Sequence, residues 1–588
     1  METIKTDVLV IGAGPAGLTM ACLLARLGVD SLTFTKYGTA DAPRAHITNQ
    51  RAVEVFRDLG VEEQAKERAL PHHLMGKQVF ATSFAGRELS RMMTWGTGDD
   101  RIGEYRAASP CEMCNIGQHV LEPILLARAE ELAADVRQHH EVLSVAQDDE
   151  KVTARVRPRD GSAEFEVVAQ YAIGCDGART VVGRDGDFAY ERGRSLGDAI
   201  TVWIEADLRR YTAHRSGALF GTVTPESKDL LSIWTCVEPW TEWSTIFVRP
   251  DLTPTDLDES SVRESVRAAI GNDDVEFKIK KISSWQFNDV VASHYRRDRL
   301  FIAGDAAHRH PPANGLGSNT SIQDSYNLAW KLALVIQGKA DDGLLDTYND
   351  ERQPVGRQVV RRANQSVVEA LGWVASLGLV PGMTPARVDA RLAEIYGPGG
   401  GAQRTRLFAG IDLMNFQFNA HGVELGQRYR SRAVVDDGEP EPAADPSRNP
   451  ALHYDPSTCP GSPVPHAWLM IDGQDVSTLD VCAYARFTLI TGPDGQPWLD
   501  AAGQLSAEFG VEIEAVPVSL GLPVNDVYGD WMRRREVGDA GCVLVRPDRI
   551  VAWRSADAVD DPTVALRNAM SSVLGSEAGI RSPILVSG

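Results

Sequence analysis

The segment TDVLVIGAGPAGLTMACLLARLG, residues 6–28, decides the fold at the start of the chain. An apolar run leads into a Gly-x-Gly-x-x-Gly turn and then into apolar residues at helical spacing, which predicts a strand, a tight turn and a helix. A second strand is expected at 31–34 and completes a βαβ unit. In such a unit the free N–H groups at the start of the helix bind the phosphates of a dinucleotide. The residues expected to contact those phosphates are Gly12, Gly14, Pro15, Ala16 and Gly17.

The end of the second strand departs from the usual dinucleotide pattern. A carboxylate normally closes this strand and binds the ribose hydroxyls, but the chain has Thr35 and Lys36 here. The departure weakens the case for a nicotinamide site and leaves open a cofactor that is held mainly by other segments. Thr35 and Lys36 are kept as candidate cofactor contacts.

Two further strands end in a carboxylate beside a glycine. YAIGCDGARTVV places Asp176 before Gly177, and FIAGDAAH places Asp305 after Gly304. Open α/β sheets bind ligands at the carboxyl ends of their strands. We therefore expect Asp176, Gly304 and Asp305 to supply further contacts to the same ligand.

The segment HRHPPANGLGSNTSIQDSYNLAWK, residues 308–331, combines polar, turn-forming and helical patterns. Three interpretations compete: a metal site on His308 and His310, a plain loop, or a cradle for a large ligand. No carboxylate or Cys at a consistent spacing completes a metal site, so no metal is expected. Thr320-Ser-Ile-Gln323 matches a capping box, which predicts that a helix begins there.

Composition limits the classes of partner. The 588 residues are enough for two or three domains, and 60 Lys and Arg oppose 81 Asp and Glu, a formal net charge of −21. This acidity disfavours nucleic acid and anionic membranes. No apolar run is long enough to span a bilayer and no signal peptide is recognisable, so the cytoplasm is the expected location. The eight Cys contain one CxxC, with no second pair for structural zinc, and idle thiols are expected.

The pattern changes along the chain. TVWIEADL and WSTIFV are rich in β-branched and aromatic residues, which predicts an antiparallel sheet in the middle. A segment rich in Pro and acidic residues then separates a new α/β pattern at the C-terminal end. The expected division is a nucleotide-binding domain in three pieces, 1–75, 100–190 and 286–365; a β-sheet domain in two, 76–99 and 191–285; a helical segment, 366–430; a linker, 431–461; and a C-terminal domain, 462–588.

A family resemblance emerges from these segments. GAGPAG, GCDGAR and AGDAAH together resemble the single-component FAD-dependent aromatic hydroxylases, the p-hydroxybenzoate and phenol hydroxylase type. PRAHITNQRAVEVFRDLG, HRHPPANGLGSNTSIQDSYNLAWKLALV and FNAHGVELGQRY are more similar still to the 2,4-dichlorophenol 6-monooxygenases. The resemblance covers nearly the whole chain.

The resemblance implies a fold and an activity. The fold would be α/β, with a Rossmann-like FAD-binding domain, an antiparallel-sheet substrate domain and a C-terminal thioredoxin-like domain without redox cysteines. FAD, NADPH or NADH as a transient reductant, and O2 would hydroxylate a phenolic or hydroxy-heteroaromatic ring through a flavin C4a-hydroperoxide. Such a reaction would serve aromatic catabolism or natural-product tailoring. No second Gly-x-Gly-x-x-Gly unit occurs in a βαβ context, so a separate NADPH domain is not expected.

The resemblance also implies roles for single residues. Asp305 would accept hydrogen bonds from the ribityl chain, and the loop 311–317 would lie along the isoalloxazine ring. The N-terminus of the helix that follows would stabilise negative charge on the reduced flavin. Further implied FAD contacts are Arg44, Gln118, Pro312, Gly315, Gly317, Ser318 and Asn319.

His46 is the candidate catalytic base, because it occupies the position where phenol hydroxylases carry an Asp. Removing the phenolic proton makes the ring more electron-rich, and a His with an ordinary pKa can accept that proton near neutral pH. Alternatively, His46 only hydrogen-bonds the neighbouring loop or FAD. Trp285 and Asn288 are candidate substrate contacts, although Trp285 could equally be core packing.

Two rival functions remain open. A flavin halogenase usually carries a WxWxIP segment, which does not occur in this chain. A non-catalytic FAD-binding protein, with the C-terminal domain as an interaction module, would not consume NADPH. The expected partners of the enzyme are a small aromatic substrate and further copies of the chain in a homo-oligomer, a dimer or higher.

Overall fold

The computed structural model describes residues 2–195, 197–249, 257–443 and 445–575. Its N-terminal part is built on a sheet in which β1 (Thr3–Ile11) runs parallel to β2 (Ser31–Thr35) and to β11 (Phe165–Gly174). Helix α1 (Pro15–Arg26) connects β1 to β2, which confirms the predicted βαβ unit. The sheet continues on both sides with β8 (Asp135–Gln138), β20 (Leu300–Ile302) and β19 (Arg296–Arg297), in the order β19-β20-β11-β1-β2-β8.

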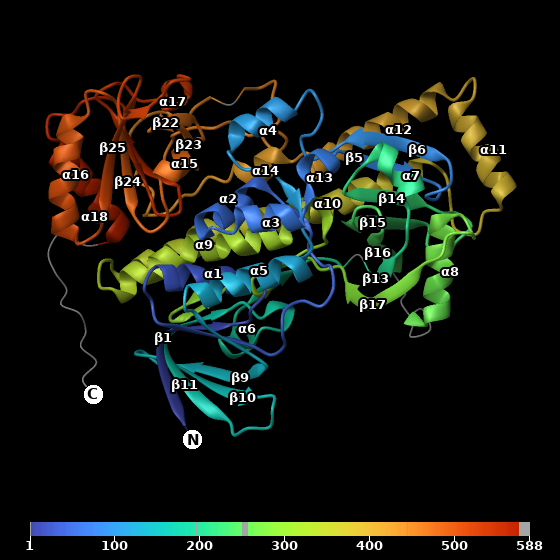
Figure 1. The fold of residues 1–588 in the computed structure, drawn as a ribbon, viewed down its shortest axis with the longest axis horizontal. Coiled ribbons are helices and arrows are strands. Elements are labelled where there is room, and N and C mark those ends of the chain that lie inside the picture. The colour runs from blue at the N-terminus through green and yellow to red at the C-terminus, as the bar shows by residue number, and fades with distance from the viewer. Residues whose placement is uncertain (1, 196, 250–256, 444, 576–588) are drawn as a thin grey trace.

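Helices cover one face of this sheet. Figure 1 shows α1 beside α5 (Gln118–Glu131) and α9 (Gly317–Ile336), above the strands β1 and β11. Val8, Leu9 and Val10 of β1 have no exposed surface. Strands buried on both faces form continuous apolar runs, which is the pattern that predicted this parallel sheet.

The middle of the chain forms a second, largely antiparallel sheet, as predicted. It lies to the right of the first sheet in Figure 1, beside α8 (Glu259–Ile270). Strands from two separate parts of the sequence join in it, because β5 pairs with β14 in parallel. Its order is β17 (Lys278–Gln286), β13 (Asp198–Glu205), β16 (Glu242–Arg249), β15 (Leu231–Glu238), β14 (Leu219–Val223), β5 (Lys77–Ala81) and β6 (Glu88–Met93).

The two faces of this second sheet differ in burial. Ile200, Val202 and Ile204 of β13 have no exposed surface and belong to a core shared with α8. Thr201 and Trp203, which alternate with them, are only partly buried. We call the second face the open face; the strand registers place Thr201, Trp203, Ile233 and Thr235 on it.

Helix α9 begins earlier than predicted. The capping box placed its start at Thr320, but the helix starts at Gly317 and no side chain caps it. Thr320 lies within the helix and is buried. Its carbonyl oxygen accepts a hydrogen bond from Arg352. The prediction was wrong because Thr320 lies within the first turn of the helix, where its N–H donates to the Leu316 carbonyl at 2.8 Å.

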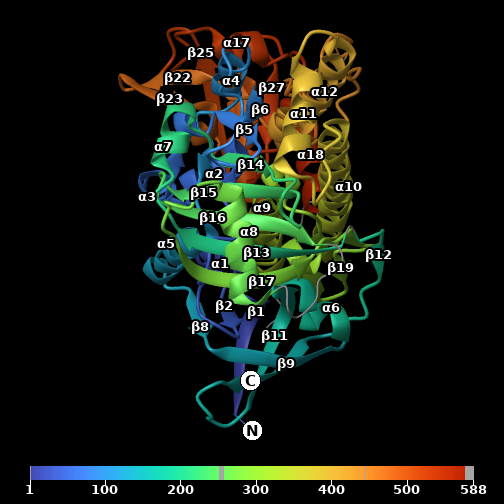
Figure 2. The same cartoon turned by 90° about the vertical axis from the view of Figure 1, so that its right-hand side faces the viewer.

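Three helices follow α9 and cover the second sheet at its outer end. They are α10 (Asp346–Ser376), α11 (Pro385–Tyr396) and α12 (Gly401–Leu413), and Figure 2 shows them side by side. Helix α10 is continuous through the expected boundary at 365/366. Trp373 near its end contacts Phe80 of β5, with 4.6 Å between ring centroids.

A third sheet forms the C-terminal domain, which has the thioredoxin-like arrangement of a mixed sheet flanked by α16 (Gln496–Phe509) and α18 (Pro562–Leu574). Between α14 (His421–Leu425) and this sheet the described residues form mainly turns and loops. The strand order is β23 (Gln474–Ser477), β22 (Trp468–Ile471), β26 (Val524–Asn525), β25 (Ile513–Ser519), β24 (Phe487–Thr491), β27 (Cys542–Val545) and β28 (Val551–Ser555).

The C-terminal domain shares its core with the first sheet's helices. Tyr484 packs on Tyr326 of α9 with 4.6 Å between ring centroids, and Phe487 meets Trp330 edge-on. One cluster of buried residues contains all four rings. The domain is therefore fixed against α9, whose N-terminal end borders the predicted cofactor loop.

Candidate functional site

The glycine turn after β1 contains two glycines with different surroundings. Gly12 is packed against the chain, and Gly14 borders open space. Gly12 has φ of +104°, and a Cβ on it would lie 2.3 Å from the carbonyl oxygen of Cys175. A Cβ on Gly14 would meet only Glu122 Oε1, at 3.8 Å. Gly12 therefore lets β1 and β11 end close together, whereas Gly14 leaves the backbone accessible to a ligand. Gly17, Pro15 and Ala16 form the first turn of α1, and a Cβ on Gly17 would collide with the Gly12 carbonyl.

The turn after β20 meets this glycine turn. The Gly304 N–H donates to Asp324 of α9 at 3.0 Å, and a Cβ on Gly304 would lie 2.7 Å from Ser321 Oγ and 3.5 Å from Ala16. The Ser325 hydroxyl donates to the Ala16 carbonyl at 2.8 Å. The glycine turn near the N-terminus thus converges with the turn after β20 and with α9 at the carboxyl edge of the sheet.

Asp305 follows Gly304 and is exposed at this edge. The surrounding protein displaces bulk water and so raises the pKa of Asp305, while the charges of His308, Arg309 and Arg44 oppose the rise. Arg44 itself is exposed. The predicted contacts Asp305 and Arg44 therefore act on each other electrostatically.

Asp176 has a local structural partner. Its Oδ2 accepts a hydrogen bond from the Val181 N–H at 2.7 Å, which stabilises the turn after β11. Its Oδ1 is buried and has no hydrogen-bond partner within the part of the chain that the structure describes. A buried carboxylate oxygen without a partner is available to a donor on a ligand.

Gln118 and Glu122 face the glycine turn from α5. Gln118 Nε2 donates to Glu122 Oε1 at 2.6 Å, and the Ala40 N–H donates to the other oxygen of Glu122. Burial raises the pKa of Glu122, and the hydrogen bonds from Gln118 and Ala40 and the charge of Arg44 oppose this effect. The predicted contact Gln118 thus lies one helical turn before Glu122, whose carboxylate borders Gly14.

The end of β2 has a different arrangement. Thr35 is its last residue, and Lys36 Nζ bonds to Glu141 Oε1 at 2.7 Å on the exposed surface. The Lys36 ammonium is therefore already paired with a carboxylate of the chain. Both residues stay predictions as cofactor contacts.

The loop before α9 is pinned to the chain segment that contains His46. A Cβ on Gly315 would lie 2.7 Å from Ile47 Cβ, and Asn319 Nδ2 donates to the Ile47 carbonyl at 2.8 Å. Asn319 Oδ1 accepts from the Asn49 N–H at 3.0 Å. Asn319 was predicted to contact the flavin, and its amide is used in these internal bonds. Of the other predicted loop residues, Pro312 is exposed and Gly317 and Ser318 are partly buried at the same edge.

His46 has a hydrogen-bond partner on each ring nitrogen. Nδ1 lies 2.6 Å from Asn115 Oδ1, and Nε2 lies 3.0 Å from Thr235 Oγ1 on the open face of the second sheet. Burial lowers the pKa of His46 from 6.5 to about 4, and the bond to Asn115 opposes the shift. The expectation of an ordinary pKa was wrong, because both partners are neutral and cannot offset the loss of water.

Sequence reasoning did not identify Asn115 or Thr235. They lie 69 and 189 residues from His46 in the chain, and neither belongs to a motif. Asn115 arrives opposite His46 through the short strand β7 (Cys114–Asn115), which pairs with β3 (Ile47–Thr48). Only the register of this pairing brings the two side chains together.

The predicted substrate residues lie at the far end of the same sheet. Trp285 of β17 donates from Nε1 to Thr201 Oγ1 at 2.8 Å on the open face, three strands from β15. Asn288 donates to the Gln286 carbonyl at 2.8 Å, within its own turn. Trp203, which was not predicted, lies between them and His46 on the open face and meets the His119 ring at 5.4 Å.

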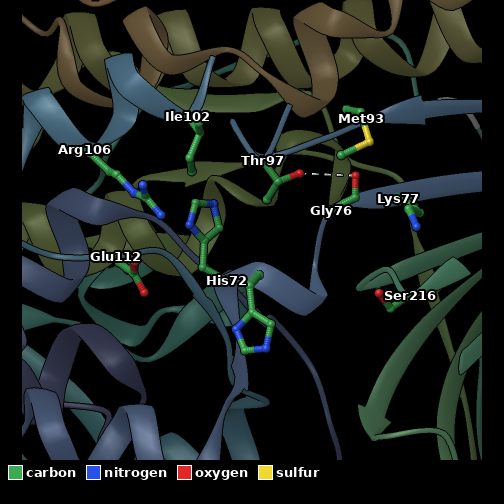
Figure 3. Close-up of a pocket in the computed structure, with 10 residues that line it drawn as sticks. His72, Gly76, Lys77, Met93, Thr97, Ile102, Arg106, Glu112 and Ser216 are labelled. Atoms are coloured by element: carbon green, nitrogen blue, oxygen red, sulfur yellow. Dashed lines mark hydrogen bonds between the residues drawn. The ribbon is translucent and has the colours of Figure 1, made fainter. Parts of the chain in front are cut away.

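A separate pocket opens beside β6 and α4 (Ile102–Ala108), with a volume of about 260 Å³. Figure 3 shows His72, Arg106 and Glu112 on one side of it and Lys77 and Ser216 on the other. None of its lining residues is a predicted site residue. His72 is held by the Trp95 carbonyl at 2.6 Å, and burial lowers its pKa.

Other classes of site were sought among the described residues. They include no group of three or more His, Cys, Asp or Glu side chains that could hold a metal ion. His308, the centre of the discarded metal interpretation, bonds to Asp324 at 3.0 Å inside the core. Within the same described ranges, none of the helices has the length and apolar content needed to cross a bilayer.

Comparisons with known proteins find two family models that match the chain. A family model described as FAD binding domain matches residues 5–363, and one described as aromatic-ring hydroxylase, C-terminal, matches residues 457–576. The chain is 42% identical over 579 residues to 2,4-dichlorophenol 6-monooxygenase of Delftia acidovorans, covering 97% of this chain and 98% of that one. It is 40% identical over 576 residues to phenol 2-monooxygenase of Pseudomonas sp. (strain EST1001), covering 97% and 93%. The crystal structure of the flavin-dependent monooxygenase PieE in complex with FAD and substrate superposes with a TM-score of 0.93 at 43% identity, covering 98% of this chain and 100% of that one.

Proposed function

Since this chain belongs to the FAD-dependent aromatic-ring hydroxylases, we propose that its substrate is a phenol or a hydroxy-heteroaromatic ring. The enzyme is a monooxygenase that uses FAD with NAD(P)H as reductant. The observation that carries the substrate proposal is the position of His46. Its ring bonds to Thr235 on the open face of the second sheet, and the next residue, Ile47, accepts a hydrogen bond from Asn319 in the first turn of α9.

The residues at the carboxyl edge of the first sheet fit FAD. Gly14 presents backbone with no protein atom nearer than 3.8 Å to a Cβ built on it, at the N-terminus of α1. Asp305 is exposed beside it, and the buried Asp176 Oδ1 has no partner among the described residues. When bound and reduced, FAD supplies the means of activating dioxygen for transfer to the ring. In this arrangement Gly14 and Gln118 would hold the phosphates, and Asp305 the ribityl hydroxyls.

His46 would assist by accepting the phenolic proton. Because burial lowers its pKa to about 4, the imidazole is neutral at physiological pH but a weaker base than an ordinary His, so it takes up the proton only as the phenolate forms beside it. A deprotonated phenol pushes electron density to its ortho and para carbons, where an electrophilic oxygen attacks. A general base in this position thus favours a phenolic substrate over a plain arene.

The open face supports an aromatic substrate. Trp203 and Trp285 lie on it, only partly buried, and Phe287 packs on Trp285 with 4.7 Å between ring centroids. Partly buried aromatic side chains next to polar groups are typical of small-molecule sites. Trp285 and Asn288 remain proposed substrate contacts. Both aromatic catabolism and tailoring of a natural product are compatible with such a face.

Adding a phenol to the purified, yellow enzyme tests the proposal. We expect NADPH oxidation to accelerate on addition of a phenol, together with oxygen uptake and a product heavier by one oxygen atom. Rapid NADPH oxidation that gives only hydrogen peroxide with every phenol and hydroxypyridine tried would contradict the proposed substrate class. A non-catalytic FAD-binding protein would show no acceleration.

Asp305→Ala tests the cofactor contacts. The variant should be isolated with less FAD, because losing charge-assisted hydrogen bonds to ribityl hydroxyls costs about 1.5–3 kcal/mol each. FAD content is read from the ratio of absorbance at the flavin and protein bands. Asp160→Ala is a matched control, since Asp160 is exposed and its carboxylate accepts a hydrogen bond from the Ser162 N–H in a surface turn. Full FAD occupancy in Asp305→Ala would remove Asp305 from the site.

Further partners and location belong to the same proposal. O2 would be the second substrate, and the cytoplasm, where NAD(P)H is available, the location. A homo-oligomer is supported by exposed apolar side chains on adjacent helices, Val368 and Leu371 of α10 and Phe408 of α12. Light scattering of the holoenzyme would give its mass.

We also propose that the chain divides into the domains expected from the sequence, with the bounds given there. It is supported by the second sheet, which takes β5 and β6 from 76–99 and β13 to β17 from 191–285. Limited proteolysis with mass analysis of the fragments would test it at the 431–461 linker, where cleavage is expected first.

A further inference from the structure

The hydrogen bonds around His46 fix its tautomer. Asn115 Nδ2 donates to the Cys236 carbonyl at 2.8 Å, so the amide oxygen is the atom that faces His46 Nδ1. An amide oxygen only accepts, and Nδ1 must therefore carry the ring proton. Nε2 therefore has a lone pair, which accepts a hydrogen bond from the Thr235 hydroxyl with 3.0 Å between Nε2 and Oγ1.

The proton acceptor, His46 Nε2, is thus already hydrogen-bonded to the Thr235 hydroxyl. A neutral imidazole nitrogen has one lone pair, and the Thr235 hydroxyl already uses it. The hydroxyl oxygen, by contrast, keeps two lone pairs of its own. Resting on the proposed function of His46, we propose that a phenolic substrate binds to the Thr235 hydroxyl, which relays the substrate proton to Nε2 while Asn115 holds the ring in place.

The neighbouring elements place this relay between the start of α9 and the second sheet. Asn319 binds the Ile47 carbonyl and Asn49 N–H, so the residue after His46 is tied to the first turn of α9. Thr235 comes from β15 in the second sheet and projects from its open face. The relay therefore lies between the start of α9 and the open face of the second sheet, which is proposed to bind the substrate.

The step is balanced as a concerted double transfer. The phenolic O–H bond breaks as its proton forms a new O–H bond on Thr235, and the original Thr235 proton forms an N–H bond at Nε2. The products are a phenolate, a neutral Thr235 and an imidazolium. The two opposite charges lie one hydroxyl apart, so their attraction offsets part of the burial that keeps free His46 neutral.

Neutral groups dominate the surroundings of His46. The groups that bond to it are the Asn115 amide from β7 and the Thr235 hydroxyl from β15, and its carbonyl accepts from the Ile116 N–H at 2.7 Å. Arg44 and Asp41 are the charged residues on its own segment, and both are exposed. The relay thus acts without a carboxylate partner for the imidazole.

Thr235→Val tests the relay, because valine keeps the shape of the side chain and removes the hydroxyl. Thr235→Ser should restore it, and His46→Gln removes the final acceptor. Thr222→Val is the matched control: Thr222 is buried in the adjacent strand β14 and its hydroxyl bonds to Ser232 at 2.7 Å on the opposite face. Each variant is checked for FAD content and thermal midpoint. If Thr235→Val does not fold, Thr235→Ala takes its place.

Two measurements are made on each variant. The first is the ionised fraction of pentafluorophenol, a phenol acidic enough to lose its proton to a weakened imidazole, bound to the oxidised holoenzyme and read from its ¹⁹F resonances, which needs no turnover. The second is the rate of product formation below the substrate's own pKa. We expect Thr235→Val to lower the ionised fraction and to slow product formation by about a hundredfold, as His46→Gln does. Thr235→Ser and Thr222→Val should resemble the wild type.

The outcomes separate the relay from the base. If Thr235→Val matches the wild type in both measurements while His46→Gln is impaired, the proton reaches His46 directly and the relay is wrong. If His46→Gln also matches the wild type, the proposed role of His46 falls and the relay with it. Equal impairment of Thr235→Val and Thr235→Ser would show a packing role for Thr235, and this too would overturn the relay.

Discussion

At the scale of single residues, the site combines a neutral His with neutral partners. A buried His whose pKa is lowered to about 4 contributes stability that is fully present above its ordinary value of 6.5 and is lost as the pH falls toward 4. Over the same interval the imidazole becomes protonated and can no longer accept a proton. Both the stability and the proposed chemistry of His46 therefore favour neutral and alkaline pH.

His46→Gln should slow hydroxylation more than it weakens FAD binding. Glutamine retains a polar side chain toward Asn115 and Thr235 but cannot accept a proton at these pH values. The deficit should be about a hundredfold below the substrate's pKa and shrink as the pH rises, because solvent then supplies the phenolate. Product formation is measured from about pH 6 to about pH 10, with FAD content in parallel. A deficit independent of pH, or a loss of flavin that accounts for it, would identify a structural His.

At the scale of elements, the strand–turn–helix unit assigns different jobs to two glycines in one motif. The packing of the chain prevents a side chain at Gly12, because a Cβ there would collide with the backbone of Cys175, which follows β11. Gly14 borders open space at the N-terminus of α1. The first glycine is required by the fold and the second by the ligand.

Gly12→Ala and Gly14→Ala should therefore fail in different ways. Gly12→Ala must displace backbone, because its Cβ would lie 2.3 Å from a carbonyl oxygen at a φ of +104°, and the apoprotein should melt at a lower temperature. Gly14→Ala should leave apoprotein melting nearly unchanged and weaken FAD binding, since its methyl group occupies the approach to the pyrophosphate. Thermal melting of both apoproteins and fluorescence titration with FAD make the comparison. The same loss of melting temperature in both variants would contradict this division.

At the scale of the whole molecule, buried charges join the C-terminal domain to the FAD-binding domain. Arg546 of the C-terminal domain bonds to Glu351 of α10 at 2.6 Å, and Lys331 of α9 bonds to the same carboxylate at 2.7 Å. The next residue, Arg352, bonds to Asp324 at 2.8 Å, which accepts the Gly304 N–H. The C-terminal domain is thereby connected, through two adjacent residues of α10, to the turn that presents Asp305.

Arg546→Met should destabilise the holoenzyme and lower its FAD affinity. Removing one partner of a buried ion pair costs about 3–5 kcal/mol, because the remaining charge lacks water. Arg546 also bonds to Asp548 at 2.6 Å, so its loss removes the cation that pairs with two buried carboxylates, Glu351 and Asp548, and leaves Lys331 to balance them. Arg567→Met in the same domain is the control, since Arg567 pairs with Glu508 on the surface at 2.9 Å. Thermal midpoints of the two variants that agree within error would show that the network does not stabilise the assembly.

Much of the fold follows from local patterns in the sequence. The glycine turn, the parallel strands around it and the antiparallel middle sheet were predictable, because chain sterics and the periodic burial of apolar residues act over a few residues. The carboxylates Asp176 and Asp305 were assigned to strand ends for the same reason. The family resemblance added FAD and the likeness to phenol hydroxylases, which the comparisons confirm.

Tertiary structure alone decided how these parts act together. Helix α9 starts at Gly317 and not at the capping pattern of Thr320, which lies buried in the first turn and accepts a hydrogen bond from Arg352 of α10. The tautomer and lowered pKa of His46 depend on Asn115 and Thr235, which strand registers bring from distant parts of the chain. Hydrogen-bond partners and exclusion of water are properties of the packed assembly, so no local stretch of sequence contains them.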